Sequence, residues 1–573
     1  MTQASGPVSG PGPIPGAFSP DSTKGSIPMK KKFLIMLSAV LLLSAALPPL
    51  AGADSRDDDS TVRCAPVHVA APKGTRVVSV TAAAQPGGTV TLPNLPPVTD
   101  VPAYCDITIT LTHPGAGDSV RVKLVLPQDR GRWNGRFQAT GGSAYLAGDL
   151  DGIIATPLLD GVKNGYATAA TDAGVGQNPI DVSDWALTTT GRVNRPLLQN
   201  FASRSLHDLA VVGKSATATF YGQDARYAYW NGCSTGGRQG YQLAQDYPQD
   251  FQGILAKAPA ISWDRFAVAA LWSQAVFNSE HVQPTQCELT AFTDAAVRAC
   301  DRLDGVTDAI IDNPAACRWD PRRLVGTTID CEGQRMTISR ATAEAVRKIW
   351  QGPQTPSGRR LWYGPNKGAN LESLASVGKP FTVADSWVRY FVQQNPSFDT
   401  TKLTYQTFDR VFAESQRRYH AVIGSDDPDL SAFARAGGKL LSWHGQSDQL
   451  VPTRGTIDYR ERVNRHAGGN SAVDRHYRLF LLPGVAHCGG GPGGQPVDDL
   501  GALVSWVEQG TPPNTLTVSA TRADGKTAAR HVCAYPQSTR YLGHGDPDDA
   551  ASYRCSSTDT HGHRSSHLQE VDQ

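Results

Sequence analysis

The pentapeptide GCSTG at residues 232–236 places Ser234 between two glycines. A strand that ends abruptly where a helix begins leaves such a serine hydroxyl exposed, and the glycines avoid the clashes that larger residues would cause in the turn. Residues 226–230 are aromatic and strand-like, and the residues after the serine have helical periodicity as far as Pro248. We therefore expect Ser234 to be a nucleophile, with an inert serine in a glycine-rich connection as the alternative.

A serine hydroxyl needs a base within hydrogen-bond reach and a carboxylate that orients this base. Asp448, in WHGQSDQLVP, and His487, in LPGVAHCGGG, each follow an apolar strand late in the chain. The order serine, acid, histidine is typical of α/β-hydrolases. We predict that the three side chains form a catalytic triad. The alternative for Asp448 is a turn aspartate that caps a loop, and the alternative for His487 is a loop histidine without a role. Two other histidines, His444 and His466, have no comparable setting in the sequence.

An acyl-transfer site also needs two N–H donors aimed at the oxyanion. Thr235, directly after the serine, is expected to supply one through its backbone. The segment ATGGSAYLAG (139–148) follows an early strand, and Gly142 or its neighbour Gly141 is the candidate for the other. An ordinary glycine turn is the alternative.

Cys233 precedes the expected nucleophile, and Cys488 follows the expected base. If the triad forms, Ser234 and His487 are adjacent in space, which brings the two cysteines near bonding distance. We therefore predict a disulfide between the nucleophile loop and the base loop. The even number of cysteines, ten, favours a fully paired set in an exported chain, and no Cys-x-x-Cys pair or histidine cluster at zinc spacing is present.

The elements that must position these residues alternate between strand-like and helix-like patterns from about Ser119. This alternation predicts an α/β protein, with an α/β-hydrolase core and a large inserted lid. The pattern is lost after Pro259 and returns late in the chain. The strand-like segments are 119–127, 136–142, 165–174, 253–259, 438–452 and 477–488, and residues 204–222 and 498–510 are helix-like.

Four segments are expected along the chain. An upstream extension with a signal peptide comes first, the lid with its many Trp, Cys and Pro residues interrupts the core, and a C-terminal tail follows the second part of the core. Their bounds are 1–53 for the extension and signal peptide, 54–261 and 438–573 for the two parts of the core, and 262–437 for the lid.

Residues 29–53 have a basic start, an apolar centre and a small-residue cleavage site, Ala51-Gly52-Ala53, as in a signal peptide. A membrane anchor is the alternative, but the apolar run from Phe33 to Leu47 is shorter than the ~20 residues that a spanning helix needs. We therefore expect a secreted or periplasmic protein whose mature chain starts near Asp54.

Length and composition narrow the possible functions. The chain has 573 residues, 40% of them hydrophobic, and can bury a large core. Its net charge of +1, from 54 basic and 53 acidic residues, gives no overall field that would attract nucleic acid or an anionic membrane. A small molecule is the expected partner, and no oligomeric state follows from these numbers.

The constellation Cys-Ser, Asp and His-Cys at 233–234, 448 and 487–488 resembles that of the tannase and feruloyl esterase family of α/β-hydrolases, which includes mono(2-hydroxyethyl) terephthalate hydrolase. The similarity runs from about Cys64 to Cys555. Further matching stretches are WNGRF (133–137), KAPAISW (257–263) and CAYPQSTRYLGHGD (533–546).

The resemblance implies an exported serine carboxylesterase of the feruloyl esterase type, which cleaves esters of aromatic acids such as hydroxycinnamates through an acyl-enzyme. Within the enzyme class, the alternatives are a tannase that acts on gallate esters and a hydrolase of terephthalate half-esters. A third alternative is a binding protein that has the same scaffold but no enzymatic activity. The intact triad argues against this alternative. No organic cofactor is implied, and no membrane association after the signal peptide is cleaved.

The resemblance also implies a structural calcium ion in the lid, distant from the reaction. The segment CDRLDGVTDAIIDNPAAC (300–317) is the counterpart of the family's calcium loop, and oxygen ligands suit a hard cation such as Ca²⁺. Its spacing is not that of an EF-hand, and without the resemblance a solvated acidic turn is favoured. The implied ligands are the carboxylates of Asp301, Asp304 and Asp308 and the backbone oxygens of Val306 and Ile310.

Three further disulfides are implied in the same way: Cys64 with Cys105, Cys300 with Cys317, and Cys533 with Cys555. Cys287 and Cys331 are left over, and pairing between them is open, because the family often has two nearby cysteines after the calcium loop where this chain keeps only one. Ser143 and Ala144 stand where many members keep glycines, so the shape of the oxyanion loop is open as well.

Substrate specificity is expected to reside in the lid. Packing in the protein core explains the large side chains there equally well. The candidate contacts are Trp263, Phe266, Trp272, Trp387, Arg389 and Phe391.

Overall fold

The structure is a computed structural model that describes residues 60–522 and 524–557. The predicted signal peptide, residues 29–53, lies outside the described residues. None of the helices in the described residues combines the length and the apolar character that crossing a bilayer requires.

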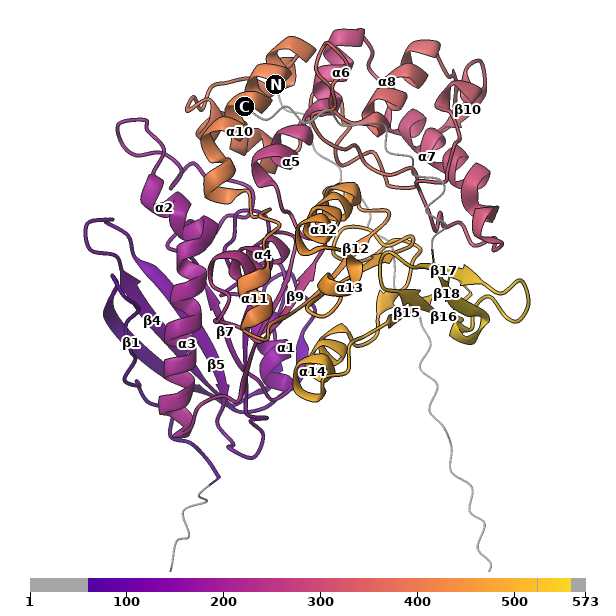
Figure 1. Cartoon of the computed structure of the whole chain (residues 1–573). Coiled ribbons are helices and arrows are strands. Elements are labelled where there is room, and N and C mark those ends of the chain that lie inside the picture. The colour runs from indigo at the N-terminus through magenta and orange to yellow at the C-terminus, as the bar shows by residue number, and fades with distance from the viewer. Residues whose placement is uncertain (1–59, 523, 558–573) are drawn as a thin grey trace, which may run out of the picture. The chain divides into compact units, whose positions relative to one another are not determined.

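The core of the protein is a sheet in which, among the described residues, nine strands follow the order β1-β4-β5-β7-β6-β8-β9-β12-β13 (Figure 1). From β7 to β13 in this order, each strand runs parallel to the next: β7, β6, β8, β9, β12 and β13. The pairs β1–β4, β4–β5 and β5–β7 are antiparallel. The α/β sheet predicted from the sequence is thus confirmed. The strands are β1 (Arg76–Gln85), β4 (Tyr104–Thr112), β5 (Val120–Pro127), β6 (Arg136–Thr140), β7 (Ala167–Thr171), β8 (Tyr227–Cys233), β9 (Gly253–Lys257), β12 (Lys439–Gly445) and β13 (Tyr477–Leu482).

Successive side chains of a strand point to opposite faces of the sheet. Both faces are buried in strands such as β7, β9 and β12, whereas the edge strand β1 has no buried residue. In β9, for example, Ile254 belongs to the apolar cluster that includes residues of α3, α4 and α12, whereas Leu255 belongs to the cluster that includes Leu503 and Trp506 of α14. Helix α1 packs against β5 and β7. The helices of this part are α1 (Pro157–Lys163), α2 (Arg195–Gln199), α3 (Ser205–Tyr221), α4 (Thr235–Asp246), α11 (Ser431–Arg435), α12 (Thr453–Ala467), α13 (Asn470–Val473) and α14 (Asp499–Gln509).

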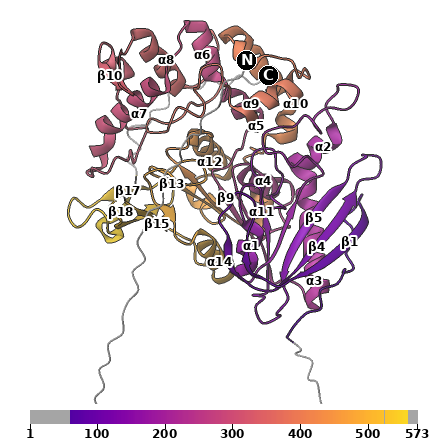
Figure 2. The ribbon, with the colours of Figure 1, turned by 180° about the vertical axis from the view of Figure 1, so that it is seen from behind.

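The residues between β9 and β12 form helices and a short hairpin, which contribute no strand to the large sheet (Figure 2). Hydrogen bonds connect them to the loops of the core: Tyr145 donates to the carbonyl of Val383, at 2.8 Å, and Asn366 donates to that of Gln446, at 2.9 Å. The elements are α5 (Trp263–Ala269), α6 (Trp272–Glu280), α7 (Gln286–Cys300), α8 (Arg340–Gln351), α9 (Thr382–Ser386), α10 (Tyr405–Ile423), β10 (Thr328–Cys331) and β11 (Gln334–Thr337).

The aromatic side chains suggested as specificity contacts lie mostly in a packed core. Trp263, Phe266, Trp272, Trp387 and Phe391 are at most 7% exposed and belong to one cluster with Tyr145 and Trp185 from the core loops. Packing therefore explains these five, and Arg389 is tied to Asp385 by an ion pair of 3.0 Å.

Smaller sheets that the sequence did not predict complete the fold. In the C-terminal part, β14 (Gln495–Pro496), β15 (Thr515–Thr521) and β16 (Thr527–Cys533) form one sheet, and β17 (Ser538–Tyr541) pairs with β18 (Tyr553–Ser556). Near the start, β2 (Gly88–Val90) pairs with β3 (Val98–Val101).

Candidate active site

Ser234 occupies the turn between β8 and α4, with the backbone angles φ 60° and ψ −118°. This is a strained conformation for a residue with a side chain, and such strain is concentrated at functional turns of this kind. The turn is held on both sides, since the Ser234 N–H donates to the carbonyl of Lys257, at 3.0 Å, and its own carbonyl accepts from the N–H of Ala260, at 3.1 Å.

The glycines around the serine permit close backbone packing. A Cβ atom on Gly232 would lie 2.5 Å from the carbonyl carbon of Gly236, and one on Gly141 would lie 2.4 Å from the Cα of Gly236. Real Cβ atoms do not approach other atoms so closely. Gly232 therefore allows the turn to fold, and Gly141 allows the 141–142 loop to pack against Gly236.

Asp448 and His487 meet above the carboxyl ends of β12 and β13, which are parallel neighbours in the sheet. The Nδ1 atom of His487 is 2.8 Å from Oδ2 of Asp448, and the His487 backbone N–H donates to the side chain of Gln449, at 3.0 Å. The structure therefore brings the expected base and the expected orienting carboxylate together in the arrangement that a triad needs.

The Asp448 carboxyl is fully buried, which by itself raises a pKa. The charge of His487 and the hydrogen bonds from His444 and His487 outweigh this effect and hold the pKa of Asp448 well below its usual range. Asp448 is therefore an anion at any pH at which the protein would act.

Cys233 and Cys488 form a disulfide with a Cα–Cα distance of 5.9 Å. This confirms the predicted link between the nucleophile loop and the base loop. Ser234 and His487 are each next to one end of this covalent bridge, so the bridge limits how far their two loops can separate.

The remaining cysteines are paired as well. The implied pairs Cys64–Cys105, Cys300–Cys317 and Cys533–Cys555 are confirmed, and Cys287 pairs with Cys331, which settles the pairing that the sequence left open. Five disulfides are typical of proteins that fold in an oxidising compartment outside the cytosol.

The second histidine near the acid, His444, was not expected to have a comparable setting. Its Nε2 atom lies 3.0 Å from Oδ2 of Asp448, the same oxygen that contacts His487. The spacing of four residues between His444 and Asp448, across the end of a strand, is the feature of the sequence that could have indicated this contact. His466 is different, because it is half exposed and its Nε2 lies 3.5 Å from a carboxylate oxygen of Asp429 at the surface.

The N–H groups of Gly141 and Gly142 are engaged within the protein. Gly141 donates to the carbonyl of Asn231, at 3.0 Å, and Gly142 donates to the side-chain oxygen of Gln239, at 3.0 Å. The expectation that one of them donates to an oxyanion must therefore be corrected, because an N–H already bonded inside the protein is not aimed at a substrate.

Ala144, in the same loop, has the free N–H that these glycines lack. In the described part of the chain, no hydrogen bond is formed by the N–H of Ala144 or by that of Thr235. The two residues are in contact, since the Thr235 hydroxyl donates to the Ala144 carbonyl, at 2.6 Å. Ala144 has a φ of 48°, in the left-handed region that favours glycine.

The acidic segment after α7 has the donor chemistry of a site for a hard cation. Oδ2 of Asp304 is buried without a hydrogen-bond partner, and burial raises the pKa of Asp304. Arg530 forms ion pairs with Asp308 and Asp312, the latter at 2.9 Å. No group of three or more His, Cys, Asp or Glu side chains in the described ranges is arranged to hold a metal ion.

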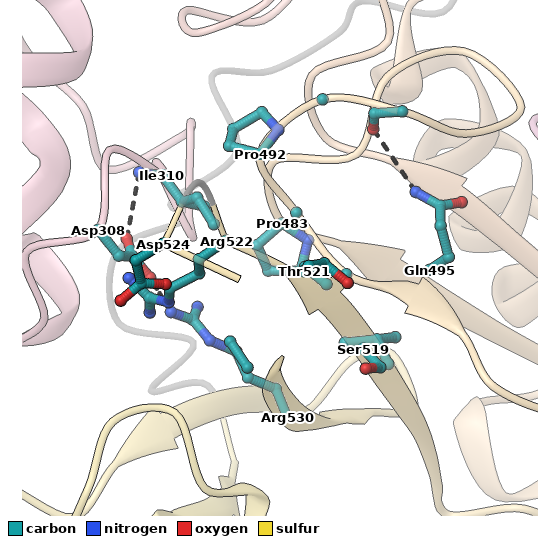
Figure 3. A pocket seen from close by; sticks show the side chains of 17 residues that line it. Asp308, Ile310, Pro483, Pro492, Gln495, Ser519, Thr521, Arg522, Asp524 and Arg530 are labelled. Atoms are coloured by element: carbon teal, nitrogen blue, oxygen red, sulfur yellow. Dashed lines mark hydrogen bonds and ion pairs between the residues drawn. The ribbon is translucent and has the colours of Figure 1, made fainter. Parts of the chain in front are cut away.

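A cavity of about 690 Å³ lies beside this acidic segment, not at the triad (Figure 3). Asp308, Ile310, Arg522 and Arg530 line it together with the glycine-rich stretch 490–494 that follows the base loop.

The sheet order, the strained serine turn at the end of a parallel strand and the Asp–His pair beyond the next strands define an α/β-hydrolase. A family model described as tannase and feruloyl esterase matches residues 105–556. The chain belongs to the tannase and feruloyl esterase family and is a carboxylic ester hydrolase of that type.

Two relatives illustrate the similarity in sequence. A probable feruloyl esterase of Arthroderma benhamiae is 41% identical over 536 residues, which cover 91% of this chain and 98% of that protein. The probable feruloyl esterase B-1 of Aspergillus oryzae is 30% identical over 485 residues, which cover 80% of this chain and 85% of that protein.

Two solved structures share the fold. The tannin acyl hydrolase from Aspergillus niger has a TM-score of 0.76 at 26% identity, over 85% of this chain and 93% of that one. The feruloyl esterase B from Aspergillus oryzae has a TM-score of 0.73 at 27% identity, over 85% of this chain and 97% of that one.

Proposed function

We propose that the protein hydrolyses esters of hydroxycinnamic acids, such as ferulate esters, with Ser234 as nucleophile, His487 as base and Asp448 as the group that orients the base. The observation that carries this proposal is the hydrogen bond of 2.8 Å between His487 and the buried, ionised Asp448. The loop of His487 is also linked by a disulfide to the strained turn of Ser234. The names of the similar proteins support the substrate class.

In the proposed reaction, Oγ of Ser234 attacks the ester carbonyl carbon while Nε2 of His487 takes the hydroxyl proton. The tetrahedral intermediate then expels the alkoxide, which leaves as an alcohol with that proton, and the acid remains bonded to Ser234 as an ester. A water molecule, deprotonated by the same nitrogen, attacks this acyl-enzyme, and the carboxylic acid is released as Ser234 regains its proton.

We assign the oxyanion donors to the backbone N–H groups of Thr235 and Ala144. Support comes from the absence of other partners for these N–H groups among residues 60–522 and 524–557, and from the hydrogen bond of 2.6 Å that joins the two residues. Gly142 and Gln239 then act indirectly, since the Gln239 side chain accepts from Gly142 and donates to the Ala147 carbonyl, at 2.8 Å, and so fixes the loop.

Steady-state kinetics on methyl ferulate, methyl gallate and a terephthalate half-ester test the proposal. We expect the highest kcat/KM for methyl ferulate, and we expect Ser234→Ala to abolish turnover of all three esters. A preference for methyl gallate would instead support the tannase alternative, which the similarity to tannin acyl hydrolase makes the second candidate. Unchanged turnover by Ser234→Ala would contradict the assignment of the nucleophile.

We propose that Ca²⁺ binds the acidic segment after α7 through Asp301, Asp304 and Asp308 and the backbone oxygens of Val306 and Ile310. The unpartnered, buried oxygen of Asp304 supports this assignment. The bound ion would offset the charge of these carboxylates and hold the segment in place; it would take no part in the ester chemistry.

We further propose that residues 29–53 act as a signal peptide and that the protein is secreted or periplasmic. The five disulfides support export. In this proposal, residues 262–437 form the lid over a core built from residues 54–261 and 438–573. The partner of the protein is a small aromatic ester, and neither nucleic acid nor a membrane is involved.

A further inference from the structure

His444 lies in β12, one residue before its end, and its side chain is fully buried. The proposed reaction of Ser234, His487 and Asp448 makes no use of it. A buried histidine has to satisfy two ring nitrogens, and the partners of these nitrogens reveal which of them carries the proton.

Both partners of Nε2 are acceptors. Oδ2 of Asp448 lies 3.0 Å away and the carbonyl oxygen of Val451 lies 3.1 Å away. A carbonyl cannot donate, and the Asp448 carboxyl is ionised, so Nε2 must carry a proton. Nδ1 lies 2.8 Å from the hydroxyl of Thr456 in α12, which can donate to it. The arrangement fits a neutral ring with its proton on Nε2.

The proton on Nε2 completes the set of donors around Asp448. Oδ1 accepts the backbone N–H groups of Leu450 and Val451, each at 2.8 Å. Oδ2 accepts from His487 and from His444. A carboxylate offers about four acceptor positions, so all of them are filled and the carboxylate has one allowed orientation.

We propose that His444 is a positioning residue for the ester hydrolysis, which holds Oδ2 of Asp448 where it fixes the orientation and the tautomer of His487. This inference rests on the proposed function. The backbone N–H groups hold only Oδ1, so His444 supplies the second point of attachment and prevents rotation of the carboxylate about its Cβ–Cγ bond. His444 also shares the negative charge of Oδ2 with His487.

Two variants separate this role from simple packing. His444→Leu removes the N–H donor but keeps an apolar side chain, and His444→Gln keeps an N–H donor near the position of Nε2. For His444→Leu we expect kcat to fall by about 10–100-fold, the loss typical of an outer partner that orients a functional group, with little change in KM. We expect His444→Gln to recover most of this loss.

The pH profile supplies a readout that a packing role would not change. Without His444, the Asp448 carboxylate has one donor fewer and interacts more strongly with protonated His487, so the acid limb of the kcat/KM profile of His444→Leu should move to higher pH. The groups that face His444 are Asp448, the Thr456 hydroxyl and the Val451 carbonyl.

His113→Leu is the matched control. His113 is also a buried histidine between acceptors, with Nδ1 2.6 Å from Asp118 and Nε2 3.0 Å from Asp208, but neither residue belongs to the triad. We expect this variant to lose stability and to keep the kcat and the acid limb of the parent protein. Equal losses of kcat in His113→Leu and His444→Leu would overturn the proposal.

Other results would overturn it as well: a folded His444→Leu protein with the kcat and acid limb of the parent, or a His444→Gln variant as impaired as His444→Leu. If neither variant folds, ¹⁵N spectra of the parent protein with labelled histidines show which ring nitrogen of His444 carries the proton. The proposal requires this proton on Nε2, and a proton on Nδ1 alone would refute it. Failure of the proposed function would show separately, as full activity of Ser234→Ala.

Discussion

Cys233 and Cys488 are bonded to each other, and their neighbours in the chain are Ser234 and His487. The bridge therefore spans 255 residues of sequence and joins the loops of the proposed nucleophile and the proposed base, whose separation would control proton transfer between them. A misplacement of these loops by ~1 Å would cost about 100-fold in rate. We therefore expect the bridge to contribute both to the stability of the fold and to the geometry of the site.

Replacing both cysteines of this bridge, Cys233→Ala with Cys488→Ala, should lower the free energy of unfolding by about 3–5 kcal/mol, because the unfolded chain loses a constraint over a long loop. The kcat of the variant should also fall, because the loops of Ser234 and His487 are no longer covalently linked. Urea denaturation and steady-state kinetics on methyl ferulate measure the two effects.

The control for this variant is Cys533→Ala with Cys555→Ala, which opens a bridge of 22 residues in the C-terminal part. It should lose stability but keep its kcat. If the Cys233 and Cys488 variant showed parental stability and kcat, the bridge would have neither role.

Asp448→Asn should lower kcat by about 10³–10⁴-fold with a folded protein. The amide oxygen can still accept from Leu450 and Val451, but the amide nitrogen then faces His487 and favours the wrong tautomer of its ring. Circular dichroism checks the fold, and kcat on methyl ferulate checks the loss. A decrease of less than tenfold would mean that Asp448 does not orient the base.

Much of this site could be predicted from the sequence because its signals are local. The glycines beside Ser234 are required by a turn whose geometry depends on a few neighbouring residues, and Asp448 and His487 each follow an apolar strand. The Cys233–Cys488 bridge followed from the expected proximity of two loops. These inferences depend on short segments and on the general topology of parallel sheets.

The oxyanion donor could not be predicted in the same way. Whether the N–H of Gly142 is free depends on the side chain of Gln239, which is 97 residues away in sequence and reaches the loop only in the folded protein. The position of His444 against Asp448 and the small C-terminal sheets likewise depend on tertiary contacts that no local pattern encodes.

Removal of calcium should lower the thermal stability of the protein. With free Ca²⁺ at about 100 times its Kd, binding contributes about 2.7 kcal/mol, so we expect Tm to fall by about 2–4 °C when EGTA replaces calcium. Asp304→Asn should abolish the difference, because it removes a ligand whose oxygen has no other partner. Differential scanning calorimetry measures Tm.

Asp294→Asn, an exposed aspartate in α7, is the matched control and should keep the calcium response. Equal Tm values with calcium and with EGTA in the parent protein would refute the calcium proposal, and the ester chemistry would be unaffected.

Acidification should destabilise the protein through His476. Burial and the nearby charges of Arg460, Lys439 and Arg475 lower the pKa of His476 to about 4, from 6.5. Between about pH 4 and 6.5 the unfolded state binds more protons than the folded state, so stability falls as pH decreases through this window, by about 2–3 kcal/mol in total.

His476→Gln cannot titrate and should therefore show a smaller loss of stability between pH 7 and 4 than the parent protein, by urea denaturation at each pH. His466→Gln, at a half-exposed position, should keep the parental pH dependence. Parallel pH curves for His476→Gln and the parent would show that His476 is not buried in its neutral form.

The site of covalent labelling shows directly whether Ser234 is the nucleophile. The parent protein, treated with a fluorophosphonate and digested, should carry the label on Ser234, and Ser234→Ala should carry none and lose ester hydrolysis. A protein that hydrolyses methyl ferulate while Ser234 remains unlabelled, or one labelled at another serine, would show that Ser234 is not the nucleophile.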